Sequence, residues 1–81
     1  MTETMIKSDE ILDVRGLSCP MPMLKTKKAL KGMKSGQIIE VWGTDPGSKN
    51  DIPNFCEKNG NELLDMTDSP EGYTQYFIKK G

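Results

Sequence analysis

The sequence has no histidine and only two cysteines among its 81 residues. Without an imidazole there is no Ser–His–Asp or Cys–His catalytic pair, no histidine metal ligand and no proton shuttle that titrates near neutral pH. The two cysteines, Cys19 and Cys56, are too few for a zinc site or for a disulfide-stapled secreted domain. We therefore expect neither a metal site nor a cofactor.

The chain also lacks an excess of one charge and any long apolar run. Its 11 basic and 12 acidic side chains leave a net charge of −1, which gives no general reason to bind nucleic acid or an anionic membrane. No segment approaches the roughly 20 apolar residues of a membrane span, and the first ten residues contain no apolar core of a signal peptide. We expect a reduced, cytoplasmic, soluble protein that binds neither membrane nor nucleic acid directly.

The length allows one domain. Residues 1–9 are polar and aperiodic and are expected to form a flexible tail, with a single domain over 10–81. Segments rich in β-branched and aromatic residues, bounded by turn residues, predict four strands. These strands are expected at 11–14, 37–44, 62–67 and 73–79.

Residues 20–34 show the periodicity of an amphipathic helix. The residues expected on its buried face are Met23, Thr26, Ala29, Leu30 and Met33. The opposite side carries Lys25, Lys27, Lys28, Lys31 and Lys34. Ser35 and Gly36 are expected to end the helix, with Gly36 in the left-handed position that follows a C-terminus.

A second helix is expected after the turn Asp45-Pro46-Gly47 and before Asn59-Gly60. Because proline is tolerated only in a first turn, Pro53 favours Asp51 as the N-cap, with Ser48 as the competing cap. Cys56 shares an apolar stripe with other residues of this helix, so we favour a core position over a second redox cysteine. The stripe consists of Ile52, Phe55 and Cys56.

The element order is β-α-β-α-β-β. Right-handed crossovers place both helices on one face of the sheet. The predicted fold is an α/β (α+β) two-layer sandwich with a mixed four-stranded sheet of strand order 1-2-4-3. Ile39 and Val41 should then face the helices, leaving Ile38, Glu40 and Trp42 on the open face. The apolar residues of this set, Ile38 and Trp42, indicate either a docking or self-association surface, or a tryptophan partly covered by its neighbours. The expected oligomeric state is a monomer or weak oligomer.

The segment from Gly16 to Pro22 joins the first strand to the first helix and places Cys19 at or next to the helix N-cap. The helix dipole and free N–H groups there favour a thiolate. Pro20 and Pro22 have no N–H, so only Met21 in the first turn can donate at short range, and the activation should be modest. The prolines instead stiffen the helix start and would hold the thiol outward. The alternative is that Cys19 is a small buried residue at the junction.

No general base adjoins Cys19 in the sequence, which argues against a cysteine protease or transglutaminase mechanism. A carrier of sulfur needs no catalytic machinery of its own, because the proteins at each end of the relay supply it. The sequence therefore favours a sulfurtransferase-like carrier that depends on partner enzymes.

The stretch Leu12-Asp13-Val14-Arg15-Gly16-Leu17-Ser18-Cys19-Pro20-Met21-Pro22 resembles the signature of the TusA/SirA family of small sulfur carriers, whose hallmark is Cys-Pro-x-Pro. Asp45-Pro46, then Asp51-Ile52-Pro53 and Phe55, resemble the family's second block. Tyr76-Phe77-Ile78-Lys79-Lys80-Gly81 resembles its last strand. The likeness covers roughly residues 10 to 81.

This resemblance implies the β-α-β-α-β-β fold and a persulfide carried on Cys19, supported by the motif residues Gly16, Pro20, Met21 and Pro22. It implies a cysteine desulfurase or rhodanese-like sulfur donor and an acceptor protein of a DsrE/TusD-like or related type. The sulfur would serve tRNA thiolation, cofactor biosynthesis or dissimilatory sulfur metabolism. Met21 departs from the acidic residue of the tRNA-thiolation members, which leaves the pathway, and the choice between sulfur and selenium, open.

Around the motif, the first helix mixes apolar and basic side chains: Met21, Leu24, Lys25 and Lys28. This surface is either solvated or a docking site, and we favour docking of an acidic protein partner. RNA is less favoured because no aromatic side chains interleave with the lysines. Two further hypotheses stay open: a non-catalytic interaction or regulatory module that uses this basic face and the open sheet face, and a thiol–disulfide switch between Cys19 and Cys56.

Overall fold

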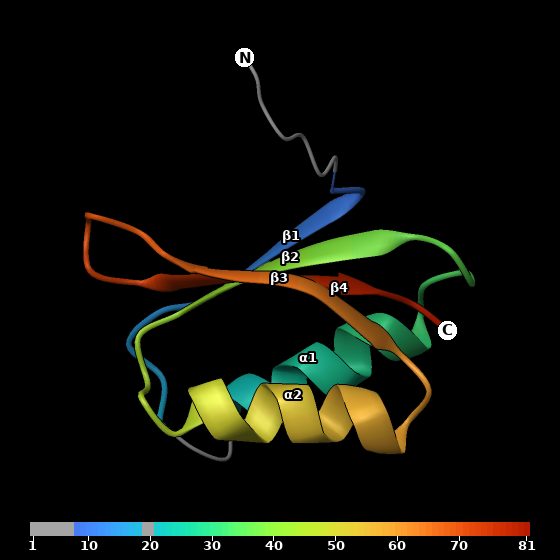
Figure 1. Ribbon diagram of the computed structural model, residues 1–81, viewed down its shortest axis with the longest axis horizontal. Helices are drawn as coiled ribbons and strands as arrows, with labels where there is room; N and C mark the ends of the chain where they lie inside the picture. The colour runs from blue at the N-terminus through green and yellow to red at the C-terminus, as the bar shows by residue number, and fades with distance from the viewer. Residues whose placement is uncertain (1–7, 19–20) are drawn as a thin grey trace.

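The computed structural model describes residues 8–18 and 21–81. Along the chain, strands and helices alternate before a closing hairpin (Figure 1). The elements are β1 (Glu10–Val14), α1 (Met21–Lys31), β2 (Ile38–Gly43), α2 (Ser48–Lys58), β3 (Glu62–Asp68) and β4 (Thr74–Lys79). The predicted element order is confirmed. Each strand begins and ends at the predicted residue or one residue away from it.

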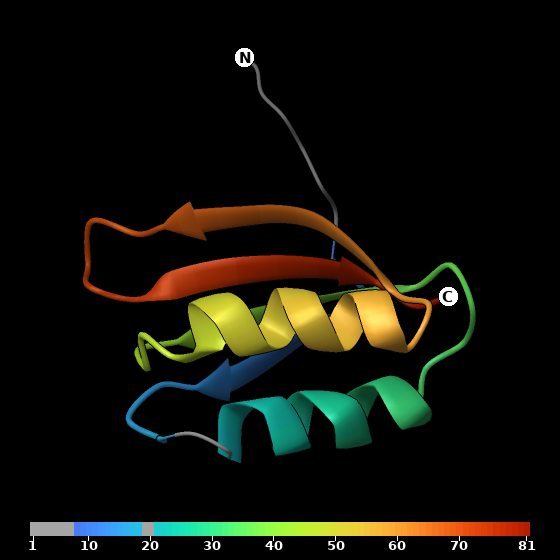
Figure 2. The same cartoon turned by 60° about the horizontal axis from the view of Figure 1, so that its bottom comes forward.

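The four strands form one mixed sheet in the order β1-β2-β4-β3, as predicted. β1 runs parallel to β2, with Leu12 opposite Val41, and the other two pairs are antiparallel. A bulge between Leu63 and Asp65 interrupts the β3–β4 register. Both helices lie on the same face of the sheet, which gives the two-layer sandwich (Figures 1 and 2).

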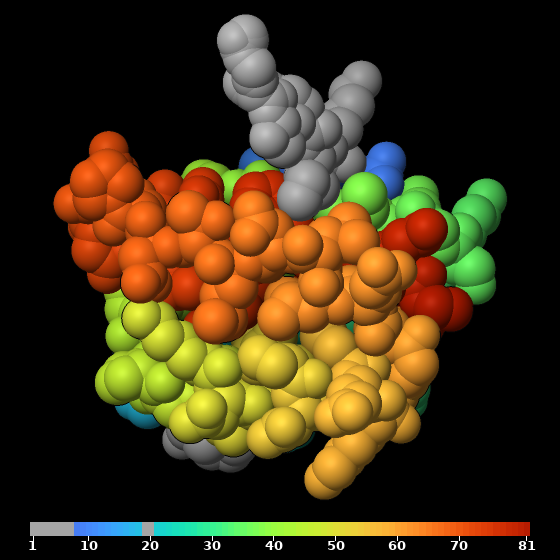
Figure 3. Space-filling view, in the orientation of Figure 1, coloured from blue at the N-terminus to red at the C-terminus, as the bar shows by residue number. Residues whose placement is uncertain are grey.

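The hydrophobic core fills the space between the sheet and the two helices. Ile39 and Val41 are fully buried there, which confirms that they face the helix layer. The other buried apolar residues are Val14, Leu30, Met33, Ile52, Phe55, Cys56, Tyr76 and Ile78. On the side formed by α2 and β3, the side chains meet along the helix and close the core (Figure 3).

Helix α1 ends at Lys31, three residues before the predicted end. The N–H groups of Gly32 and Met33 donate to carbonyls three residues earlier, so the last turn tightens as helix ends commonly do. Gly36 has the expected positive φ of 91° but lies in the loop beyond the helix, where its N–H donates to the Lys80 carbonyl. Of the predicted buried face, Thr26, Leu30 and Met33 are buried, and Met23 and Ala29 are partly buried against the core.

Helix α2 begins earlier than predicted, and the expected N-cap at Asp51 is wrong. The turn before the helix feeds directly into it: Ser48 N–H donates to the Asp45 carbonyl and Asp51 N–H to the Gly47 carbonyl. Gly47 occupies the N-cap position without a side-chain cap, and Ser48 is the first helical residue, so the competing cap is also wrong. Pro53 consequently lies inside the helix.

The open face of the sheet carries a cluster around Trp42. Its indole ring lies 5.3 Å from the Tyr73 ring, measured between centroids, and the Arg15 guanidinium carbon lies 5.2 Å from the Trp42 centroid. The indole N–H donates to Glu40, which also accepts from Gln75. Trp42 is therefore partly covered by its own neighbours, while Ile11 on the same face is 57% exposed.

The first described residues are attached to the sheet. Asp9 N–H donates to the Ile38 carbonyl, and the Asp9 carboxylate accepts from Ile38 N–H. Ser8 donates to Glu40. These two residues belong to the predicted tail, of which residues 1–7 lie outside the described part. In the described part of the chain, no helix has the length and apolar character that crossing a membrane requires.

Candidate functional site

One end of the molecule gathers the segments that the sequence singles out. The carboxyl ends of β1 and β2, the first turns of both helices and the β3–β4 hairpin all lie at this end (Figures 1 and 2). This arrangement follows from the topology, because each parallel strand leaves the sheet there and enters a helix that runs back.

The loop after β1 is fixed to the loop after β2. Gly16 has a positive φ of 84°, a conformation that favours glycine, and its N–H donates to Thr44 Oγ1 over 2.9 Å. Leu17 N–H donates to the Val14 carbonyl. The chain thus turns sharply out of β1 toward the first turn of α1. Gly16, one of the predicted motif residues, makes this turn possible. Nothing in the sequence pointed to Thr44 as its hydrogen-bond partner.

Arg15 holds the start of this loop against the open face. Its guanidinium makes two hydrogen bonds to the Asp13 carboxylate, of 2.9 and 2.8 Å, which hold the pKa of Asp13 below its ordinary value. The guanidinium carbon also lies 5.1 Å from the Tyr73 ring centroid. A cation in this position attracts the faces of both aromatic rings.

Cys19 and Pro20 lie outside the described residues, and the structure describes the residues on either side. Ser18 is exposed, and its carbonyl accepts the Met21 N–H over 2.8 Å. The sequence had left this N–H as the short-range donor to the Cys19 sulfur; in the structure it is used within the backbone. The helix dipole and the lysines of α1 are the remaining sources of positive potential near the start of this helix.

Pro22 differs from the other described motif residues because it is buried. Its carbonyl accepts a hydrogen bond of 2.8 Å from Thr26 Oγ1, which is itself fully buried. The proline therefore anchors the first turn of α1 in the core. This anchoring gives a physical basis for a stiff helix start next to Cys19.

The predicted docking residues share one side of α1, which we call the α1 stripe: Met21, Leu24, Lys25 and Lys28. Their spacing of three and four residues places them in one row along the helix. Met21 is 42% and Leu24 45% exposed, so apolar surface is open to solvent between the lysines and the motif. No acidic residue lies within α1 to offset the lysines.

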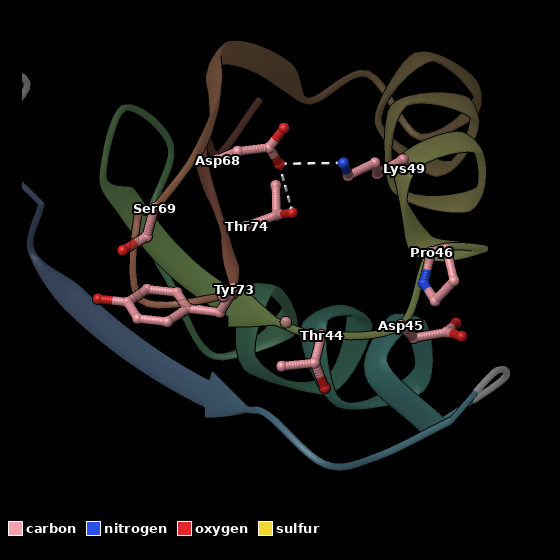
Figure 4. Close-up of a pocket in the computed structure, with 10 residues that line it drawn as sticks. Thr44, Asp45, Pro46, Lys49, Asp68, Ser69, Tyr73 and Thr74 are labelled. Atoms are coloured by element: carbon pink, nitrogen blue, oxygen red, sulfur yellow. Dashed lines mark hydrogen bonds and ion pairs between the residues drawn. The ribbon is translucent and has the colours of Figure 1, made fainter.

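A cavity of about 280 Å³ lies at the same end, between the β3–β4 hairpin and the start of α2 (Figure 4). Lys49 reaches across it from α2 to Asp68, with 3.0 Å between Nζ and Oδ1, and Thr74 also donates to Asp68. These contacts, the lysine first, hold the pKa of Asp68 below its ordinary value. Sequence analysis missed Lys49, Asp68 and Thr74, because only the folded sheet brings the hairpin to α2.

Cys56 has a different environment from the residues at this end of the molecule. Its side chain is 2% exposed in the core, and burial raises the pKa of its thiol to about 11. The core position favoured from the sequence is confirmed. Among residues 8–18 and 21–81, no group of three or more Cys, Asp or Glu residues is arranged to hold a metal ion.

Comparison with known proteins gives the family of this chain. The family model described as Sulfurtransferase TusA matches residues 10–80. The chain belongs to the TusA family. This family member is 44% identical over 72 residues to the sulfur carrier protein TusA of Allochromatium vinosum, covering 89% of this chain and 93% of that protein.

Two Bacillus subtilis relatives, both provisionally named sulfur carrier proteins, differ in length. YrkI is 46% identical over 76 residues, which cover 94% of this chain and all of YrkI. YrkF is 39% identical over 77 residues, which cover 95% of this chain but only 41% of YrkF. The TusA-family unit therefore occurs both by itself and as a part of a longer relative.

The fold agrees with a solved structure. A SirA-like protein from Desulfitobacterium hafniense superposes with a TM-score of 0.79, covering 89% of this chain and 97% of that one, at 23% sequence identity. At this identity the match supports the fold alone, and it agrees with the predicted TusA/SirA architecture.

Proposed function

We propose that this protein is a sulfur carrier that accepts sulfane sulfur as a persulfide on Cys19 and passes it to an acceptor protein. The observation that carries the proposal is the TusA family match over residues 10–80, which includes Cys-Pro-Met-Pro at the start of α1. Cys56 is unsuited to the role because it is buried, with the pKa of its thiol raised to about 11.

The transfer needs no net redox change. The Cys19 thiolate attacks the terminal sulfur of a donor persulfide, the new Sγ–S bond forms, and the donor's own S–S bond breaks to release its thiolate. In the second half, an acceptor thiolate attacks the same terminal sulfur, and Cys19 leaves as a thiolate. The attacking group in each half is a thiolate, so the positive potential of α1 assists both.

Several features of the described residues support this role. The residues that flank the motif, Ser18 and Met21, are exposed, whereas Pro22 anchors the turn in the core. The α1 stripe offers apolar and basic surface to a visiting protein next to the motif. We propose a cysteine desulfurase or a rhodanese-like protein as donor and a protein of a DsrE/TusD-like or related type as acceptor, in the cytoplasm. The sulfur would go to tRNA thiolation, cofactor biosynthesis or dissimilatory sulfur metabolism.

Mass spectrometry of the loaded protein tests the proposal. The full chain is incubated with a cysteine desulfurase and L-cysteine, and intact mass should increase by one sulfur atom, which peptide mapping assigns to Cys19. Cys56→Ala should load as the unchanged protein does, and Cys19→Ser should not load. Equal loading of Cys19→Ser would refute Cys19 as the carrier, and no loading from either a desulfurase or a rhodanese donor would favour the interaction-module hypothesis.

A further inference from the structure

The two edges of the sheet are covered differently. On the β3 edge, side chains of α2 and β3 meet and close the core (Figure 3). On the β1 edge, a groove of about 420 Å³ lies between β1 and α1. Its lining residues are Glu10, Leu12, Lys25, Lys28, Ala29 and Gly32.

The backbone of β1 is unpaired on its outer side in the described sheet. β1 is the first strand in the order and pairs only with β2. Lys80 N–H donates to the Gln37 carbonyl, so Gln37 and every second residue after it point their backbone groups at β4, and Glu40 points its own at β1. In the parallel pair Ile11 lies opposite Glu40, so Glu40 bonds to the two residues that flank Ile11, which are Glu10 and Leu12. Ile11 and Asp13 therefore direct their N–H and carbonyl groups outward, beside the groove. Such an edge is a template for one more strand.

The groove is lined by two apolar side chains, by two lysines from α1 and by Glu10 from β1. Leu12 and Ala29 are half-buried at its base, whereas Lys25 and Lys28 rise from α1 at its border. Lys25 and Lys28 also belong to the α1 stripe, so the groove continues into the exposed surface of Leu24 and Met21. The stripe ends at the first turn of α1, two residues after Cys19 in the sequence.

We propose that the β1 edge binds an extended acidic segment of a sulfur-exchanging partner protein by strand addition. The segment pairs with the outward backbone groups of Ile11 and Asp13 and inserts one apolar side chain into the groove. Acidic side chains two residues away, on the same face of the added strand, pair with Lys25 and Lys28. The two lysines outnumber Glu10 in the groove lining, and α1 contains no acidic residue, so the surface favours an acidic segment over a basic one.

This inference rests on the proposed function for the identity of the partner, but its test does not depend on sulfur loading. The probe is a blocked peptide, Glu-Val-Leu-Val-Glu, titrated into the isotope-labelled full chain and followed by amide chemical shifts. Shifts should be largest at Ile11 and Asp13 and along the groove side of α1. N-methylation of the peptide amides that face β1 should abolish binding, whereas methylation of the alternate amides should not.

Charge reversal on α1 has a matched control. Lys25→Glu with Lys28→Glu should weaken peptide binding by about tenfold or more, equivalent to about 1.4 kcal/mol. Lys27→Glu with Lys31→Glu changes the same charge on the side of α1 toward α2 and should leave binding within about twofold. Equal weakening by both pairs would show a diffuse charge effect and overturn the proposal.

Filling the groove provides a test that leaves charge unchanged. A Cβ added at Gly32 would meet only the Ala29 carbonyl, at 3.8 Å, so Gly32→Leu can place its side chain in the groove without a clash at Cβ. Gly32→Leu should abolish peptide binding, with an unchanged circular dichroism spectrum.

Three other results would overturn the proposal. These are no peptide binding at millimolar concentration, preferential binding of a single-stranded oligouridylate at the same lysines, and sedimentation showing that a second copy of the chain occupies the β1 edge. Failure of Cys19 to load sulfur while the peptide binds as described would instead refute the carrier function and leave the docking surface intact.

Discussion

At the scale of single residues, the fold separates the two cysteines by environment. Cys56 is enclosed by the core, where desolvation disfavours the thiolate and raises the pKa of the thiol to about 11. Cys19 belongs to a motif whose described neighbours, Ser18 and Met21, are exposed. Reactivity toward a modifying reagent follows from thiolate content and access, so the two thiols should differ in both.

Cys56 should be unreactive in the native protein. Iodoacetamide at pH 8 should modify Cys19 rapidly, whereas Cys56 should react only when urea unfolds the chain. Peptide mapping after timed alkylation measures both rates. Comparable native rates for the two thiols would contradict the proposed difference.

The raised pKa of Cys56 also predicts a pH dependence of stability. Below about pH 9 the thiol is protonated in both states, and between about pH 9 and 11 only the unfolded chain loses the proton. The free energy of unfolding should therefore fall across this window, by up to about 2–3 kcal/mol. Urea titrations at a series of pH values should show a smaller fall for Cys56→Ala, which lacks the group but keeps the other titrating residues.

Gly16 is the residue of the motif whose conformation demands glycine. Its φ of 84° means that Gly16→Ala should lower the free energy of unfolding by about 1–2 kcal/mol, although no atom obstructs the added Cβ. Gly32→Ala, which has no positive φ, should be neutral or slightly stabilising. Urea denaturation measures both, and equal effects would contradict an origin in backbone conformation.

At the scale of elements, the sequence predicted the type and order of every helix and strand, but not the start of α2. Apolar periodicity survives small shifts in helix bounds, so Ile52, Phe55 and Cys56 reach the core in either register. The position of the N-terminus of α2 depends instead on a balance between local hydrogen bonds and the cost of a proline inside the helix. The turn at Asp45-Pro46-Gly47 continues directly into helical hydrogen bonds, which outweighs the cost of enclosing Pro53.

Replacement of Pro53 should therefore stabilise the protein. A proline inside a helix removes one backbone hydrogen bond, here to the Lys49 carbonyl four residues earlier, and crowds that carbonyl. Pro53→Ala should raise the free energy of unfolding by about 1–3 kcal/mol, partly offset by the greater freedom of the unfolded chain. Pro46→Ala, in the turn before the helix, is the control and should not stabilise.

At the scale of the whole molecule, one core joins the sheet to both helices. Each helix covers the same face, and buried residues from β1, β2, β4 and both helices belong to one cluster. Neither layer keeps a core of its own without the other. Trp42, the single tryptophan, is packed against Tyr73 on the opposite face of the sheet and reports on the sheet.

Unfolding should therefore be cooperative. Urea transitions followed by Trp42 fluorescence and by helical circular dichroism should have the same midpoint, as expected for a small two-state domain. A helical transition at clearly lower urea concentration would show that the helices separate from the sheet first. Tyr73→Leu is a useful control, because it should change the fluorescence signal more than the midpoint.

The sequence by itself determined the fold class, the buried face of α1 and the chemical motif around Cys19, because these follow from periodicity, crossover handedness and local residue chemistry. Tertiary structure alone decided which distant side chains meet. The tie from Gly16 to Thr44, the pairing of Lys49 with Asp68 and the groove between β1 and α1 all join segments far apart in the chain. No local pattern encodes these contacts, since they depend on how strand twist, helix position and loop length combine when the layers pack.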